Sequence, residues 1–224
     1  MSKTYAGDNN VAHQVKAIYA GVNDVAHKVQ RAYVGVNGVA QLIYQSRVYL
    51  WSSANGDNYD LTGGWSTGNF YHQTNSGTNY SMTRMTAATW QGTHLIQGTY
   101  SSSDGTSEKG MYLMSAKAID FTPYKKLCAY MTRRTYRDNN PHDSWFGVFN
   151  ASSTLWSVTC KTSELGSKFL ASKTHSNAVN SAPEGFQLTV DVSNINGSYL
   201  LVYDNYHANM NAEININFSD IWLE

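Results

Sequence analysis

The chain has 224 residues, and its 16 Lys and Arg balance its 16 Asp and Glu, so the formal net charge is zero. Charged residues make up only 14% of the chain, which argues against a nucleic-acid binder that relies on a basic surface. Aromatic residues make up 13%, which argues against a disordered chain, and no apolar run approaches the roughly 20 residues of a membrane span. We therefore expect a protein that is made in a cytoplasm, has no secretory signal, and contacts neither nucleic acid nor membrane.

The N-terminal region contains an internal repeat. Copies begin at Tyr5, Tyr19 and Tyr33, and each keeps Tyr, Gly, Asn, Val and Ala at the same offsets. The shared pattern is Tyr-x-Gly-x-Asn-x-Val-Ala, and the third copy is cut short. A repeat of this regularity predicts one structural unit per copy.

Two interpretations of the repeat stay open. In the hairpin interpretation, the pairs Asn9-Asn10, Asn23-Asp24 and Asn37-Gly38 form type I′ turns, and the segments between them are strands of a meander. In the mixed interpretation, each Asn or Asp caps a short helix. The Val-Ala-x-x-Val spacing fits a helix face better than strict alternation does, which slightly favours the mixed interpretation.

One copy of the repeat is too small to bury a core, and three copies barely suffice. Packing against another chain would remedy this. We therefore expect residues 1–47 to oligomerise and anchor the protein through the equivalent Tyr and Val positions of the three copies. These positions are Tyr5, Val11, Tyr19, Val25, Tyr33 and Val39.

Residues 48–224 have a different character. Short runs of β-branched and aromatic residues alternate with clusters of Gly, Ser and Asn. Residues 214–218 alternate cleanly between Ile or Phe and Asn, and residues 186–192 alternate between apolar and polar residues. Many strands at this spacing predict a mainly β protein with a single jelly-roll or lectin-like β-sandwich. Trp156 and Trp222 lie within apolar alternation, so we expect both in the core.

The repeat resembles a short repeat found in structural proteins of tailed phages and prophages of Gram-positive hosts, and its third copy, AYVGVNGVAQLIY, matches best. The later portion resembles the β-sandwich placed behind such repeats. The segments that carry this second likeness are residues 61–65, 118–127, 188–199 and 220–224. The resemblance implies a virion component of the tail, baseplate or head surface, oligomeric and with a lectin-like outer domain. It supplies no catalytic residues.

The sequence contains no motif of a common enzyme class. Gly-x-Ser-x-Gly, His-Glu-x-x-His and a phosphate-binding loop are all absent, and the seven His are scattered. The oxygen-rich runs 57–60 and 138–143 do not match a calcium loop and fit turn chemistry. Cys128 and Cys160 form no Cys-x-x-Cys motif and are expected to be reduced, buried thiols. We therefore expect no enzymatic activity, no metal and no cofactor.

Sugar binding is the activity that the aromatic residues favour. Aromatic faces stack on pyranose rings, while Asn, Asp and Arg reach the hydroxyl groups. The stretch 133–145 mixes Arg, Tyr, Asn, His and Trp between two apolar runs and is the richest in such groups. Any single aromatic residue of a β-sandwich is nonetheless more often packed in the core than placed in a binding site. The candidate carbohydrate-binding residues are Tyr136, His142, Trp145, Arg137, Trp65 and Tyr59.

Taken with the sequence observations, the resemblance implies a phage virion protein that is made in the cytoplasm of a bacterial host, and analogy with fibres and spikes predicts a homotrimer. Residues 1–47 would contact the trimer partners and other virion proteins, and residues 48–224 would recognise a host surface glycan. The alternative is a purely structural capsid decoration or baseplate subunit without glycan binding. A free carbohydrate-binding module of a bacterial enzyme is a third possibility, which the lack of a catalytic domain and of a signal peptide disfavours.

Overall fold

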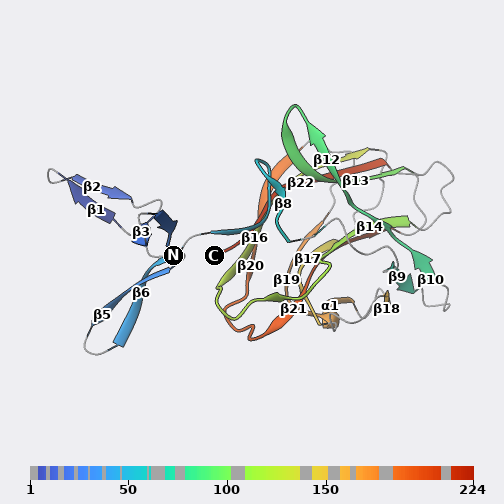
Figure 1. Ribbon diagram of the computed structural model, residues 1–224. Coiled ribbons are helices and arrows are strands. Elements are labelled where there is room, and N and C mark those ends of the chain that lie inside the picture. Colours follow the sequence, from blue (N-terminus) through green and yellow to red (C-terminus); the bar gives the residue numbers. More distant parts are fainter. Residues whose placement is uncertain are drawn as a thin grey trace. The chain divides into compact units, whose positions relative to one another are not determined.

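The computed structural model describes two compact units, Met1–Val48 together with Glu224, and Tyr49–Leu223. The described residues are 5–8, 11–14, 18–22, 25–29, 31–36, 39–45, 47–59, 61, 69–73, 79–101, 109–136, 143–150, 157–161, 165–176, 184–207 and 213–224. Figure 1 shows the strands of both units and the single short helix of the described residues.

The first unit contains three separate antiparallel hairpins, one for each copy of the repeat. They are β1 (Tyr5–Asp8) with β2 (Val11–Gln14), β3 (Tyr19–Val22) with β4 (Val25–Lys28), and β5 (Arg31–Val36) with β6 (Val39–Gln45). The three ladders share one register, in which the repeat Gly pairs with the repeat Ala. Each copy of the repeat is therefore the same structural unit.

The mixed interpretation of the repeat, in which each copy contains a short helix, is wrong. The pairs Asp8↔Val11, Val22↔Val25 and Val36↔Val39 close the ladders, which leaves two residues to connect each pair of strands. A four-residue strand is too short for its apolar residues to distinguish a helical period from a period of two. Among the described residues the three hairpins are not joined into one sheet, so the meander of the hairpin interpretation is not seen there either.

The predicted oligomerisation residues occupy two kinds of position in these hairpins. Tyr5 and Tyr19 begin β1 and β3, Tyr33 lies within β5, and the three Val residues begin β2, β4 and β6. The side chains of Tyr33 and Val34, 55% and 42% exposed, are neighbours on one strand and so lie on opposite faces of the third hairpin.

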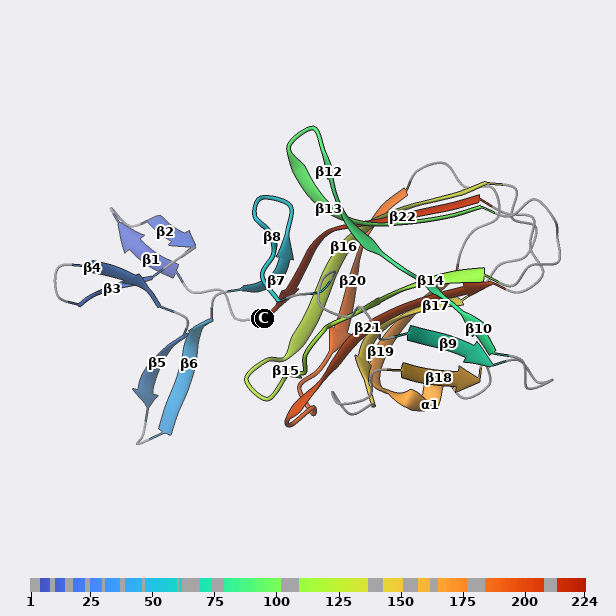
Figure 2. The same ribbon diagram turned by 45° about the vertical axis from the view of Figure 1, so that its right-hand side comes forward.

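The second unit is a sandwich of two sheets (Figures 1 and 2). The seven-stranded sheet has the order β12-β13-β22-β16-β20, with β7 paired to β22 and β8 paired to β7. Its strands are β7 (Val48–Ser52), β8 (Gly56–Asp57), β12 (Thr86–Trp90), β13 (Thr93–Ser101), β16 (Lys126–Tyr136), β20 (Glu184–Asp191) and β22 (Glu213–Leu223).

The six-stranded sheet has the order β11-β14-β21-β17-β19, with β15 paired to β21. Its strands are β11 (Thr83–Arg84), β14 (Lys109–Met114), β15 (Ile119–Asp120), β17 (Asp143–Phe149), β19 (Phe169–Ser176) and β21 (Ser198–His207). A smaller sheet, β10-β9-β18, contains β9 (Asn69–Gln73), β10 (Asn79–Ser81) and β18 (Ser157–Lys161).

The strand order is that of a jelly roll. The four-strand series β13-β22-β16-β20 faces β14-β21-β17-β19, and the chain crosses between the sheets at each of the steps 13 to 14, 15 to 16, 16 to 17, 19 to 20, 20 to 21 and 21 to 22. The predicted mainly β fold with a jelly-roll sandwich is therefore confirmed.

The core between the sheets is aromatic. The ring of Phe218 in β22 lies 5.9 Å from Phe146 in β17 and 5.0 Å from Tyr203 in β21, measured between centroids. The alternation of residues 213–218 correctly predicts the inward face, because Ile214, Ile216 and Phe218 are fully buried. Trp222 is buried as predicted, whereas Trp156 lies outside the described residues.

The six-stranded sheet also buries its outer face. Helix α1 (Leu165–Lys168) supplies Leu165 to an apolar cluster there, which we call the outer-face cluster. The strands beneath it contribute side chains that point away from the inter-sheet core. The cluster consists of Met82, Tyr112, Met114, Phe149, Leu165, Phe169, Leu200 and Val202, with Trp145 packed against it.

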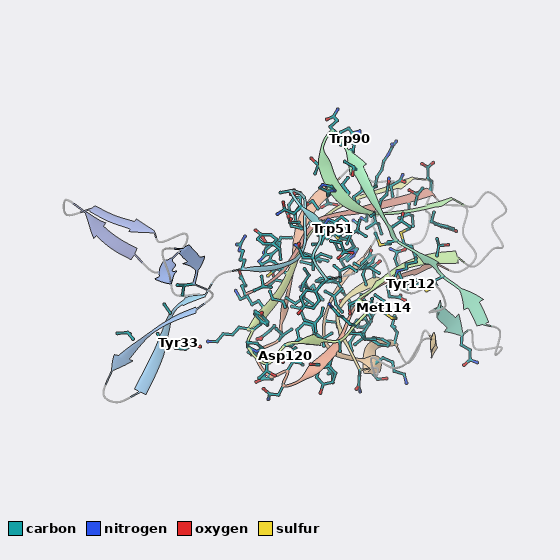
Figure 3. All side chains as sticks on the ribbon, viewed as in Figure 1. Tyr33, Trp51, Trp90, Tyr112, Met114 and Asp120 are labelled. Carbon is teal, nitrogen blue, oxygen red and sulfur yellow. The ribbon has the colours of Figure 1, made fainter. Side chains whose placement is uncertain are left out.

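The hairpin of β12 and β13 projects from the seven-stranded sheet. Its turn is Gln91-Gly92, and φ angles of +49° and +80° match a type I′ turn closed by the pair Trp90↔Thr93. Trp90 at this tip is 66% exposed (Figure 3).

Candidate functional site

Four connections leave the sandwich at one end, which we call the loop end. Residues 102–108, 137–142, 177–183 and 208–212 each run from one sheet to the other. The described strand ends beside these connections pair with one another. Each pair below joins a residue next to one connection to a residue next to another. The pairs are Ser101↔Glu213, Tyr136↔Glu213, Lys109↔His207 and Asp143↔Ser176.

A chain of polar side chains runs from the exposed Glu184 into the space between the two sheets near the loop end. We call it the inter-sheet polar chain and define it as Glu184, Arg133, His175, Tyr203, Asn205 and Ser144. Its members come from five strands, β16, β17, β19, β20 and β21, and therefore from both sheets. The chain connects the two layers where the candidate loops begin.

Arg133 is the charged centre of this chain. Its side chain is 5% exposed, and its two terminal nitrogens lie 3.1 Å from Nδ1 of His175 and 3.4 Å from Oε2 of Glu184. The guanidinium also lies 5.5 Å from the ring centroid of Phe186. These contacts offset the cost of removing a guanidinium from water.

The geometry sets the tautomer of His175. Arginine can only donate, so Nδ1 of His175 accepts the hydrogen bond from Arg133 and the ring proton lies on Nε2. Nε2 is 3.5 Å from the hydroxyl of Tyr203, and the two rings stack with centroids 6.0 Å apart. The imidazole thus joins the guanidinium to the phenol.

Tyr203 and Asn205 form the deepest part of the chain. Complete burial raises the pKa of Tyr203 well above its ordinary value, although hydrogen bonds from Ser144 and Asn205 oppose the shift. Nδ2 of Asn205 donates to Oγ of Ser144 at 2.7 Å and to the Tyr203 hydroxyl at 3.4 Å. These neutral donors and acceptors at the deep end of the chain fix the side chains of Ser144, Tyr203 and Asn205 in place.

The strand registers place the candidate residue Trp145 on the outer face of the six-stranded sheet. Cross-strand pairing puts one residue from each of five neighbouring strands in a line across the sheet. In the order of the strands, these are Arg84, Tyr112, Asp204, Trp145 and Thr174. The indole of Trp145 stacks on Phe169, with centroids 5.7 Å apart and planes 16° apart. One face of this candidate ring is therefore occupied by the protein's own core.

The other candidate residues are distributed as follows. Tyr136 is the last residue of β16 and lies at the loop end, where residues 137–142 follow it. Arg137, His142 and Trp65 lie outside the described residues. Tyr59 lies elsewhere, with the Lys117 ammonium 5.0 Å from its ring, and Lys117 follows the end of β14 that points away from the loop end.

His175, Tyr203 and Asn205 carry no motif that marks them as functional residues in the sequence. The only signal was Asp204-Asn205 directly after an apolar run, which breaks the pattern of a buried strand. Among the described residues there is no group of three His, Cys, Asp or Glu that could hold a metal ion. None of the helices described here is long and apolar enough to cross a membrane.

Among known proteins, similarity to this chain is found only at the level of structure. No family model matches the chain, and no curated protein matches it. Among solved structures, the chain is similar to the family 30 carbohydrate-binding module of the cellulosomal cellulase Cel9D-Cel44B of Clostridium thermocellum, at 10% sequence identity and a TM-score of 0.34. That similarity covers 80% of this chain and 96% of the module.

Proposed function

We propose that this protein is a non-enzymatic structural component of a tailed-phage virion that binds a host surface glycan at the loop end of its sandwich. The observation that supports the glycan assignment is that the strand ends on either side of four inter-sheet connections meet at one end, beside the inter-sheet polar chain. Tyr136 is the last residue of β16 at this end, and Arg137 and His142 follow it in the sequence before β17 begins. Loops on a rigid scaffold are the usual place for a recognition site.

The virion assignment is supported by the repeat. Its pattern resembles a repeat of phage structural proteins, and its three copies form three hairpins of one register. Isolated two-stranded hairpins are marginal in water, and the third exposes apolar residues on both faces. A partner chain that covers these faces would stabilise the unit, and a homotrimer is the assembly we propose.

A glycan array tests recognition. The full chain would be applied to surface glycans of Gram-positive hosts together with Arg137→Ala, His142→Ala and the control Lys125→Ala. Lys125 is exposed next to the first residue of β16, far from the loop end, so its loss removes one positive charge without touching the site. We expect specific binding that both loop-end variants lose and the control keeps. Silence of the full chain on every glycan would instead support a purely structural capsid or baseplate role.

Light scattering tests the assembly. The solution mass of the full chain would be compared with that of a truncation that begins at Arg47. A trimeric full chain and a folded monomeric truncation would support the repeat as the assembly device. If the full chain and the truncation are both monomers, the proposal that the repeat drives assembly is wrong.

A further inference from the structure

One arginine contacts residues at both ends of the connection 177–183. His175 lies two residues before this connection, and Glu184 is the first residue after it. Nη1 of Arg133 lies 3.1 Å from Nδ1 of His175, and Nη2 lies 3.4 Å from Oε2 of Glu184. We call these three residues the arginine clamp. Because β19 and β20 belong to different sheets, the clamp joins the two sheets at the loop end.

The arginine clamp requires a neutral imidazole. A guanidinium has only N–H donors, so Arg133 and His175 form a hydrogen bond only while Nδ1 keeps its lone pair. A proton from solvent that adds to this lone pair gives an imidazolium, in which both ring nitrogens are donors. Two cationic donors would then face each other where Arg133 is 5% exposed and the ring of Phe186 lies beside both groups. Screening by water is weak at such a site, so protonation makes the contact repulsive.

The surroundings of His175 supply more positive than negative charge. Among the described residues, the ionisable groups on the inward faces of the strands around it are Arg133 on β16, Glu184 on β20, Tyr203 on β21 and Lys173 on β19 itself. Burial raises the pKa of Tyr203, so its phenol is neutral, and β17 contributes the uncharged Ser144. Arg134 and Asp204 point to the outer faces of their sheets. Two cations and one carboxylate therefore disfavour a positive charge on His175.

We propose that the arginine clamp is a pH-sensitive contact, which fixes the ends of the connection 177–183 at neutral pH and releases them in acid. A histidine of an unfolded chain binds its proton near pH 6.5, at about the ordinary value. Stability falls with pH wherever the unfolded state binds more protons than the folded state. The stabilisation by the clamp is therefore complete above about pH 6.5 and is lost as the pH falls below it. This inference goes beyond the proposed function, because it holds whatever the loop end binds.

Urea unfolding of the full chain at about pH 7.5 and at about pH 5 tests the clamp. All six Trp lie between residues 51 and 222, so tryptophan fluorescence follows the sandwich and not the repeat. The comparison variant is His175→Gln, which offers Arg133 an acceptor but takes up no proton. Between the two pH values, we expect the unfolding equilibrium constant to rise about tenfold more in the unmodified chain than in this variant. That is the scale on which protein surroundings usually alter proton binding by a histidine.

Two control variants assign the proton to His175. His94→Gln replaces a half-buried histidine at the end of β13 away from the loop end, and it should keep the pH dependence of the unmodified chain. Glu184→Gln removes a negative charge, on a side chain that is 57% exposed, beside Arg133 and should enlarge the pH effect. Equal pH dependence in His175→Gln and the unmodified chain would overturn the proposal. A smaller pH effect in Glu184→Gln would also overturn it, because the carboxylate would then be the titrating group.

Long-range proton–nitrogen NMR of the unmodified full chain tests the neutral state directly, even if His175→Gln fails to fold. At about pH 7.5 the imidazole of His175 should be the tautomer with its proton on Nε2 and none on Nδ1. Acidification should convert it to the imidazolium. A proton on Nδ1 of the folded chain at neutral pH would contradict the clamp, since Arg133 could not then donate to that nitrogen.

Discussion

Substitution of Gly147 by alanine should be among the most damaging small changes in the sandwich. Gly147 lies in β17 opposite Ser172 of β19. A Cβ at Gly147 would collide with the carbonyl oxygen of Ala171 and lie 2.7 Å from Cα of Ser172. Both are backbone atoms of the paired strand, which bends here because the register shifts after Val148. The methyl group can be accommodated only if the two strands separate.

The magnitude follows from two opposing effects. Overpacking costs about 1–3 kcal/mol, and the clash with backbone atoms puts this site at the upper end of that range. Loss of the glycine's freedom in the unfolded chain returns about 0.4–1 kcal/mol. We therefore expect a net loss of about 2 kcal/mol. For a domain of this size, that lowers the melting temperature by about 4–8 °C. Urea unfolding followed by tryptophan fluorescence measures the free energy directly.

Gly166→Ala is the matched control. The new Cβ would lie 3.1 Å from the edge of the Trp145 ring, which is a side chain that can move, and alanine favours the short helix α1. We expect a change of less than about 1 kcal/mol. Equal stability losses in Gly147→Ala and Gly166→Ala, or a stable Gly147→Ala protein, would refute the claim that the β19 backbone leaves no room.

Three smaller predictions address other features. Gln91→Asn should raise the free energy of unfolding by about 0.5 kcal/mol, because Asn-Gly suits the type I′ turn better than Gln-Gly; an unchanged urea midpoint would contradict this turn assignment. Burial raises the pKa of Tyr203, so its neutral form stabilises the fold below the ordinary pKa of 10.0, and that contribution declines as the pH rises above this value. The urea midpoint should therefore fall less steeply above this pH in Tyr203→Phe than in the unmodified chain, and identical slopes would count against the assignment. Hydrogen bonds from the side chain and backbone of Ser193 lower the pKa of Asp191, so Ser193→Ala should move it back toward 3.8 in a carboxylate NMR titration.

The sandwich was predictable because its strands follow simple alternation. Over residues 214–218 of β22 the inward residues are Ile and Phe and the outward ones are Asn, so a period of two identifies both the strand and its buried face. In β21 the same rule fails. Residues 200–205 are buried on both faces, because the outer-face cluster covers the six-stranded sheet, and a continuously buried strand shows no alternation.

The sequence predicted the period of the repeat and its turn positions but not its secondary structure. Its period and its Asn-rich pairs were visible, and these pairs lie where the hairpins turn back. The choice between helix and strand depended on four-residue segments. Cross-strand pairs such as Val22 with Val25 decide that choice, and local spacing does not reveal them.

The polar groups of the candidate site could not be found from local sequence. Arg133 and His175 are 42 residues apart, and Tyr203 is 28 residues further along the chain. They meet because three crossings between the sheets bring β16, β19 and β21 to one end. Sequence reasoning selected the stretch 133–145 for its composition, and its two ends lie in different sheets.

The packing of Trp145 determines how recognition should be tested. Its indole is stacked on Phe169, and its far edge faces Gly166, so truncation to alanine would remove packing from the outer-face cluster. Loss of an aromatic side chain from such a cluster costs about 3–5 kcal/mol when it is fully buried, and a half-buried ring costs less. A loss of glycan binding in Trp145→Ala would therefore report a disturbed sheet as readily as a lost contact. Arg137 and His142 lie in the connection after β16 and leave β17 intact when they are replaced, so their variants separate recognition from stability.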